Sequence, residues 1–200
     1  PAVARDVSEI AGVGGVYPYR FANFRLGEST KEVVGITPEA LVVAGPDAAM
    51  DIDVREGDIT QLSGDGLAVQ RDVADDRGWS IGDRVVATFP AGDRDLEVVA
   101  LYEDDTLIGD YVVGIDTFSA NFAEVNDSLV LINLDAGVDQ KAAQGAIQQR
   151  LDAGYPGVEV KDLDEYVGDV KAQVNQFLGL ITALLALAVL IALLGVLITM

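Results

Sequence analysis

Apolar and charged residues are distributed unevenly along the chain, and the clearest break lies near its C-terminal end. Residues Phe177 to Met200 form an apolar run without a charged side chain. As a helix rising about 1.5 Å per residue, this run would be roughly 36 Å long, enough to cross a hydrocarbon core of about 30 Å with some tilt. The pattern therefore predicts a transmembrane helix at 177–200, preceded by a polar domain at 1–176.

An amphipathic segment leads directly into this run. Apolar residues of 162–176 recur at spacings of three and four, as on one face of a helix, and Asp162 or Asp164 is placed to cap it. Gly168 is the one weak helix former within the segment. We therefore expect one continuous helix, with a rigid strut at 162–176. The stripe that would couple the strut to other helices consists of Leu163, Tyr166, Val167, Val170 and Val174.

The preceding residues alternate between apolar and polar types, which is typical of strands. The strongest pair is a hairpin, Arg84 to Phe89 with Leu96 to Tyr102, joined by a turn at 90–95 that is rich in Pro, Gly and Asp. A short helix is expected at Val3 to Ile10, and another after Tyr111 to Ile115, capped by Asp116 or Thr117. Further strands are predicted at 16–26, 32–36, 67–70 and 128–134.

A strand, helix, strand unit is predicted next, resembling half of a ferredoxin-like fold. The helix at 137–151 would be capped by Asp139, and a strand would return at Val158 to Lys161. The fold class is thus α+β, with a mixed sheet, this ferredoxin-like (βαβ) lobe, a β-rich inserted lobe at about 46–124 and a C-terminal transmembrane α-helix. The inner face of the helix should carry Ala142, Ala143, Ala146, Ile147 and Leu151.

The charge balance limits the classes of partner that the chain can be expected to bind. With 33 Asp and Glu against 13 Lys and Arg, the net charge is −20. This sign argues against binding to nucleic acid and to anionic headgroups, which both need Lys and Arg. Because positive residues are retained in cytoplasmic loops, so few of them beside a span favour the outer side of the membrane for 1–176.

The composition also limits the chemistry. The chain has no cysteine and no histidine, so thiolate or histidine metal sites, Ser-His-Asp triads and a Cys nucleophile are excluded. Acidic clusters lie at Asp47 to Asp58 and around Glu103 to Asp110. The first fails the EF-hand spacing, and in a chain this acidic the second also favours a solvated loop over a cation site. We therefore predict no catalytic, cofactor-binding or metal-binding residues and no cofactor.

Within the apolar run, small residues recur four positions apart. Such spacing lets a second helix approach closely, although alanine is common in any span. The residues that would form this packing face are Gly179, Ala183, Ala188, Ala192 and Gly195.

Two stretches resemble a known family. Val174 to Met200 is similar to the start of the second membrane helix of FtsX-like permeases, the MacB and lipoprotein-releasing branch of ABC transporters. Gly78 to Asp104 (GWSIGDRVVATFPAGDRDLEVVALYED) resembles a strand, turn, strand segment of their extracytoplasmic core domain. The heavy acidity departs from better known members.

The resemblance implies a permease with four spans and an extracytoplasmic MacB-like core domain between the first two. It implies as partners a cytoplasmic ABC ATPase subunit, a second permease copy in a homo- or heterodimer, membrane lipid and an envelope protein. The chain would then be an excerpt of a longer polypeptide in the cell membrane. The alternative is a membrane-anchored binding or sensor module without an ATPase; an enzyme is disfavoured.

Overall fold

The computed structural model describes residues 2–42, 52–103, 108–123 and 126–199. The chain divides into two compact units, Pro1–Pro156 and Gly157–Met200, and each is described by itself. The first unit holds all the strands that the structure describes and the second holds one long helix, α6 (Leu163–Thr199). The α+β class with a mixed sheet is confirmed.

Strands of the first unit belong to one sheet of both parallel and antiparallel pairs. Their bounds are β1 (Val13–Leu26), β2 (Ser29–Ile36), β3 (Val54–Gly57), β4 (Gly66–Gln70), β5 (Arg84–Phe89), β6 (Gly92–Tyr102), β7 (Tyr111–Gly114) and β8 (Leu129–Leu134). The helices are α1 (Ala2–Ser8), α2 (Glu39–Val42), the 3-10 turn η1 (Ile59–Leu62), α3 (Arg71–Arg77), α4 (Ile115–Asn121) and α5 (Gln140–Asp152).

Six of these strands close on themselves. The order β2-β7-β4-β6-β5-β1 is completed by the antiparallel pair of β1 with β2, so the path of hydrogen-bonded neighbours returns to its start. The pairs β2–β7 and β4–β6 are parallel, while the other four are antiparallel. Strands from residues 66–114 therefore share one ring with strands from residues 13–36.

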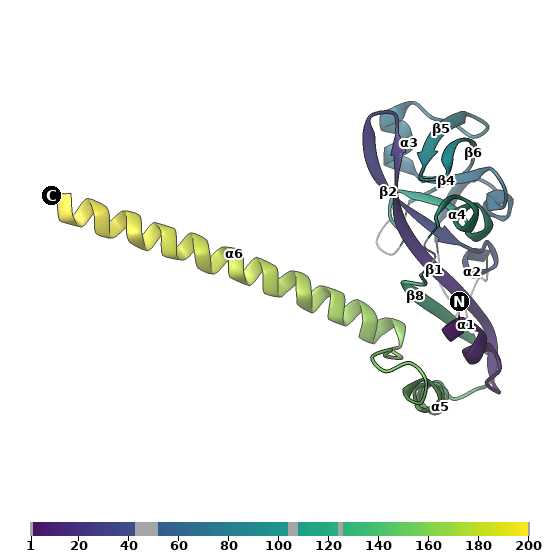
Figure 1. The fold of residues 1–200 in the computed structure, drawn as a ribbon. Helices are drawn as coiled ribbons and strands as arrows, with labels where there is room; N and C mark the ends of the chain where they lie inside the picture. The colour runs from purple at the N-terminus through teal and green to yellow at the C-terminus, as the bar shows by residue number, and fades with distance from the viewer. Residues whose placement is uncertain (1, 43–51, 104–107, 124–125, 200) are drawn as a thin grey trace. The chain divides into compact units, whose positions relative to one another are not determined.

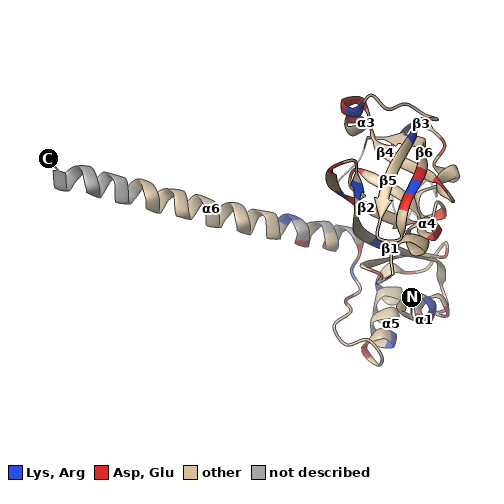
Figure 2. Ribbon diagram, turned by 45° about the horizontal axis from the view of Figure 1, so that its top comes forward, with Lys and Arg blue, Asp and Glu red and all other residues tan. Residues whose placement is uncertain are grey.

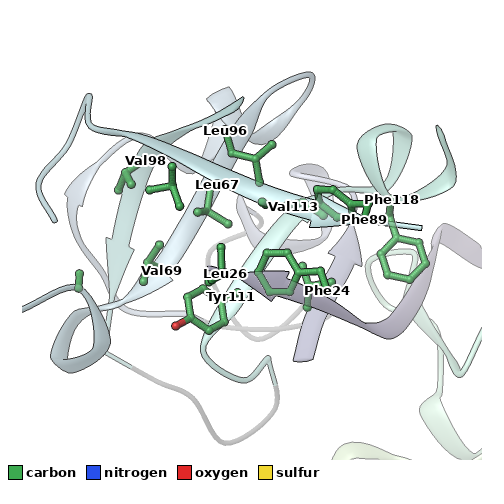
Figure 3. Close-up of a cluster of buried hydrophobic side chains, with 14 of the residues drawn as sticks. Phe24, Leu26, Leu67, Val69, Phe89, Leu96, Val98, Tyr111, Val113 and Phe118 are labelled. Atoms are coloured by element: carbon green, nitrogen blue, oxygen red, sulfur yellow. The ribbon is translucent and has the colours of Figure 1, made fainter. Parts of the chain in front are cut away.

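A hydrophobic core fills the inside of this ring. Alternating residues of the strands point inward, and aromatic side chains meet there: the ring centroids of Phe24 and Tyr111 lie 5.5 Å apart, as do those of Phe24 and Phe89. Phe118 of α4 joins the cluster (Figure 3). Because strand side chains alternate between faces, the intervening residues form a second core outside the ring, beneath α2 and η1. That core contains Tyr19, Val34, Ile36, Leu62, Ala68, Tyr102 and Val112.

Strand β1 is long enough to pair with different strands along its two halves. Its second half joins the ring, whereas Val13 to Tyr19 pair with β8 in an antiparallel ribbon. Figure 1 shows β8 alongside this part of β1, with α1 nearby. A buried ion pair connects the ribbon to α4: Arg20 Nε lies 2.8 Å from Asp127 Oδ1, and Arg20 Nη1 donates to Ser119 Oγ at 2.7 Å.

The structure corrects the predicted strand at Val158 to Lys161, because residues 158–162 are irregular. Lys161 Nζ lies 2.6 Å from Glu159 Oε2 and 2.8 Å from Asp169 Oδ2 of α6. These ion pairs connect the segment to the following helix instead. The βαβ unit therefore consists of β8 and α5 without a returning strand.

Two helix details also differ from the prediction. Neither Asp116 nor Thr117 caps α4, whose N-cap is Gly114; their side chains instead bond Gly64, with Asp116 Oδ2 accepting from its N–H and Thr117 Oγ1 donating to its carbonyl. Asp139 does cap α5, accepting from Ala142 N at 2.8 Å. Of the expected inner face of α5, Ile147 and Leu151 are buried, Ala143 is half-buried, and Ala142 and Ala146 are exposed.

The predicted hairpin is confirmed with a tighter turn. Phe89 pairs with Gly92, so β6 begins at Gly92, four residues before the predicted start at Leu96. Gly92 has φ 129°, a conformation that L side chains rarely adopt. The Pro90-Ala91 turn thus depends on glycine at the first position of β6.

Leu67→Ala tests the core inside the ring. Leu67 is fully buried in β4, so losing its side chain should lower the free energy of unfolding by about 2–5 kcal/mol. Denaturant unfolding of the full chain in detergent can be followed through Trp79, the single tryptophan. As a control, Val86→Ala at a 59% exposed position of β5 should change stability by about 0.5 kcal/mol or less. Equal effects of the two changes would contradict the packing described.

Candidate membrane helix and its N-terminal anchor

Helix α6 is continuous from Leu163 to Thr199. At about 1.5 Å per residue its length is roughly 55 Å, more than a bilayer core requires. The predicted continuous helix is confirmed, and Gly168 does not interrupt it. Figure 2 shows that the charged residues coloured on α6 lie near its N-terminal end. Beyond Lys171 the helix carries no charged residue.

The apolar part of the helix is exposed on every side as far as Val189, the last residue whose side chain is described. Each described side chain from Lys171 to Val189 is exposed, including Phe177 at 62% and Leu185 at 63%. Lys171–Val189 is the one stretch, among the described residues, that is long and apolar enough to cross a membrane. A helix that is hydrophobic all round requires an apolar environment, such as lipid or other helices.

The N-terminus of α6 is closed by reciprocal hydrogen bonds. Asp162 Oδ1 accepts from Glu165 N at 2.7 Å, and Glu165 Oε2 accepts from Asp162 N at 3.2 Å. This arrangement is a capping box, which satisfies donors that the first helical turn leaves unpaired. Of the two predicted caps, Asp162 is therefore the one observed. The partner Glu165 was not predicted, although an acidic residue three positions after a cap is its usual signal.

Lys161, the residue before the capping box, is also bonded to α6. Its hydrogen bonds to Asp169 and to Glu159 hold the pKa of the Lys161 ammonium above its ordinary value. Asp169 lies on the second turn of α6, so the ion pair fixes the residues before the cap to the helix surface. This role could not be predicted from the sequence, because a lysine before a helix is also common on solvated surfaces.

On the other side of the boundary between the units, Tyr155 is tied to the first unit. Its hydroxyl donates to Asp6 Oδ2 of α1 at 2.7 Å, and its N–H bonds Leu151 O of α5 at 2.7 Å. The first of these bonds lowers the pKa of Asp6, and the same bond raises the pKa of Tyr155. Tyr155, one residue before the end of the first unit, is therefore hydrogen-bonded to both α1 and α5.

The predicted packing residues all lie within α6. Gly179, Ala183 and Ala188 are exposed, and a Cβ added at Gly179 would meet no atom within 4 Å. The side chains at Ala192 and Gly195 lie outside the described residues. Of the predicted coupling stripe, Tyr166 is half-buried and Val174 is 52% exposed. The side chains of the other three stripe residues, Leu163, Val167 and Val170, are not described.

The acidic clusters meet across paired strands. Arg55 of β3 lies between one carboxylate of each cluster, with Nη2 2.6 Å from Asp53 Oδ2 and 2.7 Å from Glu103 Oε2. Asp58 caps η1 by accepting from Thr60. Among the residues that the structure describes, no three acidic side chains gather as metal ligands would. Asp47, Asp51, Asp104 and Asp105 of these clusters lie outside the described residues.

Comparison with known proteins identifies the fold. A search of protein-family models found no match to the chain, and a search of curated proteins found none either. Among solved structures, the periplasmic region of MacB from Actinobacillus actinomycetemcomitans matches with a TM-score of 0.56 and 11% identity, covering 76% of this chain and 72% of that one.

Two further structures agree. The extracellular domain of the noncanonic ABC-type transporter YknZ from Gram-positive bacteria matches with a TM-score of 0.56 and 15% identity, covering 80% of this chain and 85% of that one. A domain of a putative permease protein from Porphyromonas gingivalis matches with a TM-score of 0.53 and 19% identity, over 77% and 76%. The predicted resemblance to MacB-like domains is confirmed as a shared fold.

Asp162→Ala tests the capping box. Removing the carboxylate leaves the Glu165 N–H without its acceptor, which should destabilise the first turn of α6 by about 1 kcal/mol. Hydrogen exchange of the amides at 165–168 should then be about fivefold faster. Asp162→Asn is the matched control, because asparagine keeps an acceptor oxygen and should preserve protection. Equal exchange in wild type and Asp162→Ala would show that this cap does not stabilise the helix.

Proposed function

We propose that this chain is the outer domain and following membrane helix of an ABC transporter permease of the FtsX/MacB type. The observation that carries the proposal is the uninterrupted α6, which begins at a closed capping box and continues into a charge-free, fully exposed apolar segment. The shared fold with the MacB periplasmic region and the YknZ extracellular domain supports it. The role is non-enzymatic, with ATP hydrolysis in a separate subunit.

In this proposal α6 transmits movement from the membrane to the outer domain. An α-helix is held by hydrogen bonds along its whole length, so a displacement of one end moves the other. Closure of a cytoplasmic ABC ATPase would shift the membrane helices, and 162–176 would transmit the shift to an outer domain on the extracytoplasmic side. Leu163, Tyr166, Val167, Val170 and Val174 would contact neighbouring helices of the assembly.

The small residues would set the packing inside the membrane. Gly179 has open space where a Cβ would be, and Ala183 lies one turn further along the helix. Small side chains at this spacing allow helix backbones to approach closely, whether in the same permease or in a second copy. Ala188, Ala192 and Gly195 would continue the face.

The alternative is a membrane-anchored binding or sensor module without an ATPase. It uses the same domain and the same exposed helix, and it needs no packing face within the bilayer. Co-purification separates the two, because a stable complex with an ABC ATPase belongs only to the permease.

Val170→Pro tests the mechanical role. Proline within a helix removes a hydrogen bond and clashes with the preceding turn, at a cost of about 3 kcal/mol or more. We expect the complex with its ATPase to lose most of its ATP-dependent change in the distance between spin labels at exposed Val86 of two copies. Trp79 fluorescence should show that the domain remains folded.

Val170→Ala is the matched control, because alanine shortens the side chain and preserves the helix. It should retain the ATP-dependent distance change. An unchanged distance response in a folded Val170→Pro complex would contradict transmission through α6.

A further inference from the structure

Helix α3 packs over one end of the six-stranded ring. It follows β4 directly in the chain, and Val69 near the end of β4 pairs with Tyr111 at the start of β7. Ala74 of α3 belongs to the core inside the ring, and Trp79, just after the helix, packs against that core. The C-terminal part of α3 therefore lies beside Tyr111.

The C-terminal cap of α3 positions an arginine between two aromatic rings. Gly78 has φ 68°, a left-handed conformation typical of a helix cap, and the Trp79 N–H donates to Ala74 O at 2.9 Å. The guanidinium carbon of Arg77 lies 4.9 Å from the centroid of the Trp79 ring and 5.8 Å from that of Tyr111. A guanidinium that stacks on aromatic rings by its flat face keeps N–H donors along its edge.

Arg77 pairs with no carboxylate among the residues that the structure describes, although the chain has 33 Asp and Glu. Arg71, at the other end of the same helix, does form such a pair, with Glu56 at 3.3 Å. A positive charge in the last turn interacts favourably with the helix dipole, which accounts for a basic residue there. It does not account for the planar set of donors, which matches the two oxygens of a carboxylate.

The Tyr111 hydroxyl is a second polar group at this place. Tyr111 is 1% exposed, and within the described part of the chain its buried oxygen has no hydrogen-bond partner. Figure 3 shows this oxygen pointing away from Phe24. Burial raises the pKa of the hydroxyl, so it stays protonated at neutral pH and is able to donate. Since most buried hydroxyls in proteins are paired, this one is suited to a ligand that supplies an acceptor.

The neighbouring charges favour a ligand with a single negative charge. Besides burial, the nearby Asp110 carboxylate also raises the pKa of Tyr111, whereas the charge of Arg77 lowers it. Asp110 is half-buried, and its charge would repel a phosphate more strongly than a monocarboxylate. The net charge of −20 acts in the same direction.

We propose that Arg77 and Tyr111 bind a ligand through one carboxylate group, with the half-buried Trp79 ring against its apolar part. Both carboxylate oxygens accept from the edge of the Arg77 guanidinium, and one of them also accepts from the Tyr111 hydroxyl. Because this hydroxyl is buried in the free protein, the Arg77 side chain turns away from the Tyr111 ring to admit the carboxylate. The surface is separate from α6, so this inference does not depend on the permease role.

Calorimetric titration of the full chain in detergent with benzoate tests this site, and benzamide is the neutral counterpart of similar shape. Benzoate should bind about tenfold more tightly or better, because benzamide lacks the charge and the second acceptor oxygen. Benzoate should also change the fluorescence of Trp79, the single tryptophan. A peptide of two alanines and a C-terminal phenylalanine is titrated in parallel. The tighter of the two carboxylates identifies the source as a free acid or the end of a protein chain.

Variants locate the binding. Arg77→Gln should weaken the binding of benzoate about tenfold or more. The matched control is Arg94→Gln, which removes the same charge from an exposed position of β6 and should change the affinity by about twofold or less. Tyr111→Phe should weaken binding about fivefold, yet it should not lower the thermal midpoint of the free protein, because the hydroxyl has no partner to lose. Asp110→Asn should strengthen binding about twofold by removing a like charge.

Several results would overturn the proposal. Equal affinities for benzoate and benzamide would show that the carboxylate is not recognised. Unchanged affinity in Arg77→Gln and Tyr111→Phe would place the bound acid elsewhere, the detergent included. Equal weakening by Arg77→Gln and Arg94→Gln would indicate a general effect of charge. A lower thermal midpoint in Tyr111→Phe would show that the hydroxyl stabilises the free protein and needs no acceptor from a ligand.

Discussion

The apolar part of α6 fits one constraint, the need to pair every backbone polar group in a segment that would lie in lipid, out of reach of water. A bilayer offers no hydrogen-bond partners, so a spanning segment must satisfy its N–H and C=O groups internally. The charge-free part of α6 does so as one unbroken helix. Two backbone donors at the start of the helix, the N–H groups of Asp162 and Glu165, are met by the side chains of Glu165 and Asp162 respectively. The apolar end and the capped end of α6 are thus parts of one continuous hydrogen-bonded helix.

In the first unit, backbone polar groups are paired between strands instead of within one helix. Its six-stranded ring pairs strand edges with one another and encloses a core of aromatic and aliphatic side chains. Tyr155 is bonded to α1 and α5 just before the boundary between the units, whereas Lys161 is bonded to α6 just after it. Each unit therefore has its own stabilising contacts next to the boundary.

Local features could be predicted from the sequence because local residues determine them. The absence of charge after Lys171, the spacing of apolar residues and the caps at Asp139 and Asp162 all act within a few positions. The ring could not be predicted in the same way. Its closure depends on parallel pairs such as β2 with β7, whose residues lie far apart in the chain. Arg20 and Asp127 form a buried pair across a similar separation.

The incorrect predictions show where the local sequence pattern does not determine the structure. Val158 and Val160 alternate with charges as strand residues do, but the ion pairs of Lys161 join the segment to α6. Asp116 and Thr117 have the right chemistry to cap α4, yet their side chains bond the loop at Gly64. In the candidate site, the sequence predicted the helix and its cap, while the small-residue face stays a prediction because it concerns contacts with other helices.

The most direct test of the central claim is a spin-label scan of Lys171 to Val189 in lipid bilayers. Accessibility to oxygen and to a water-soluble nickel chelate distinguishes lipid from water at each position. The account predicts that labels from Phe177 onward are open to oxygen and protected from nickel, with labels at Gly179 and Ala183 more restricted than their neighbours at a period of about 3.6 residues. Nickel access throughout Leu180 to Val189 would show that the helix remains in water and would contradict the account.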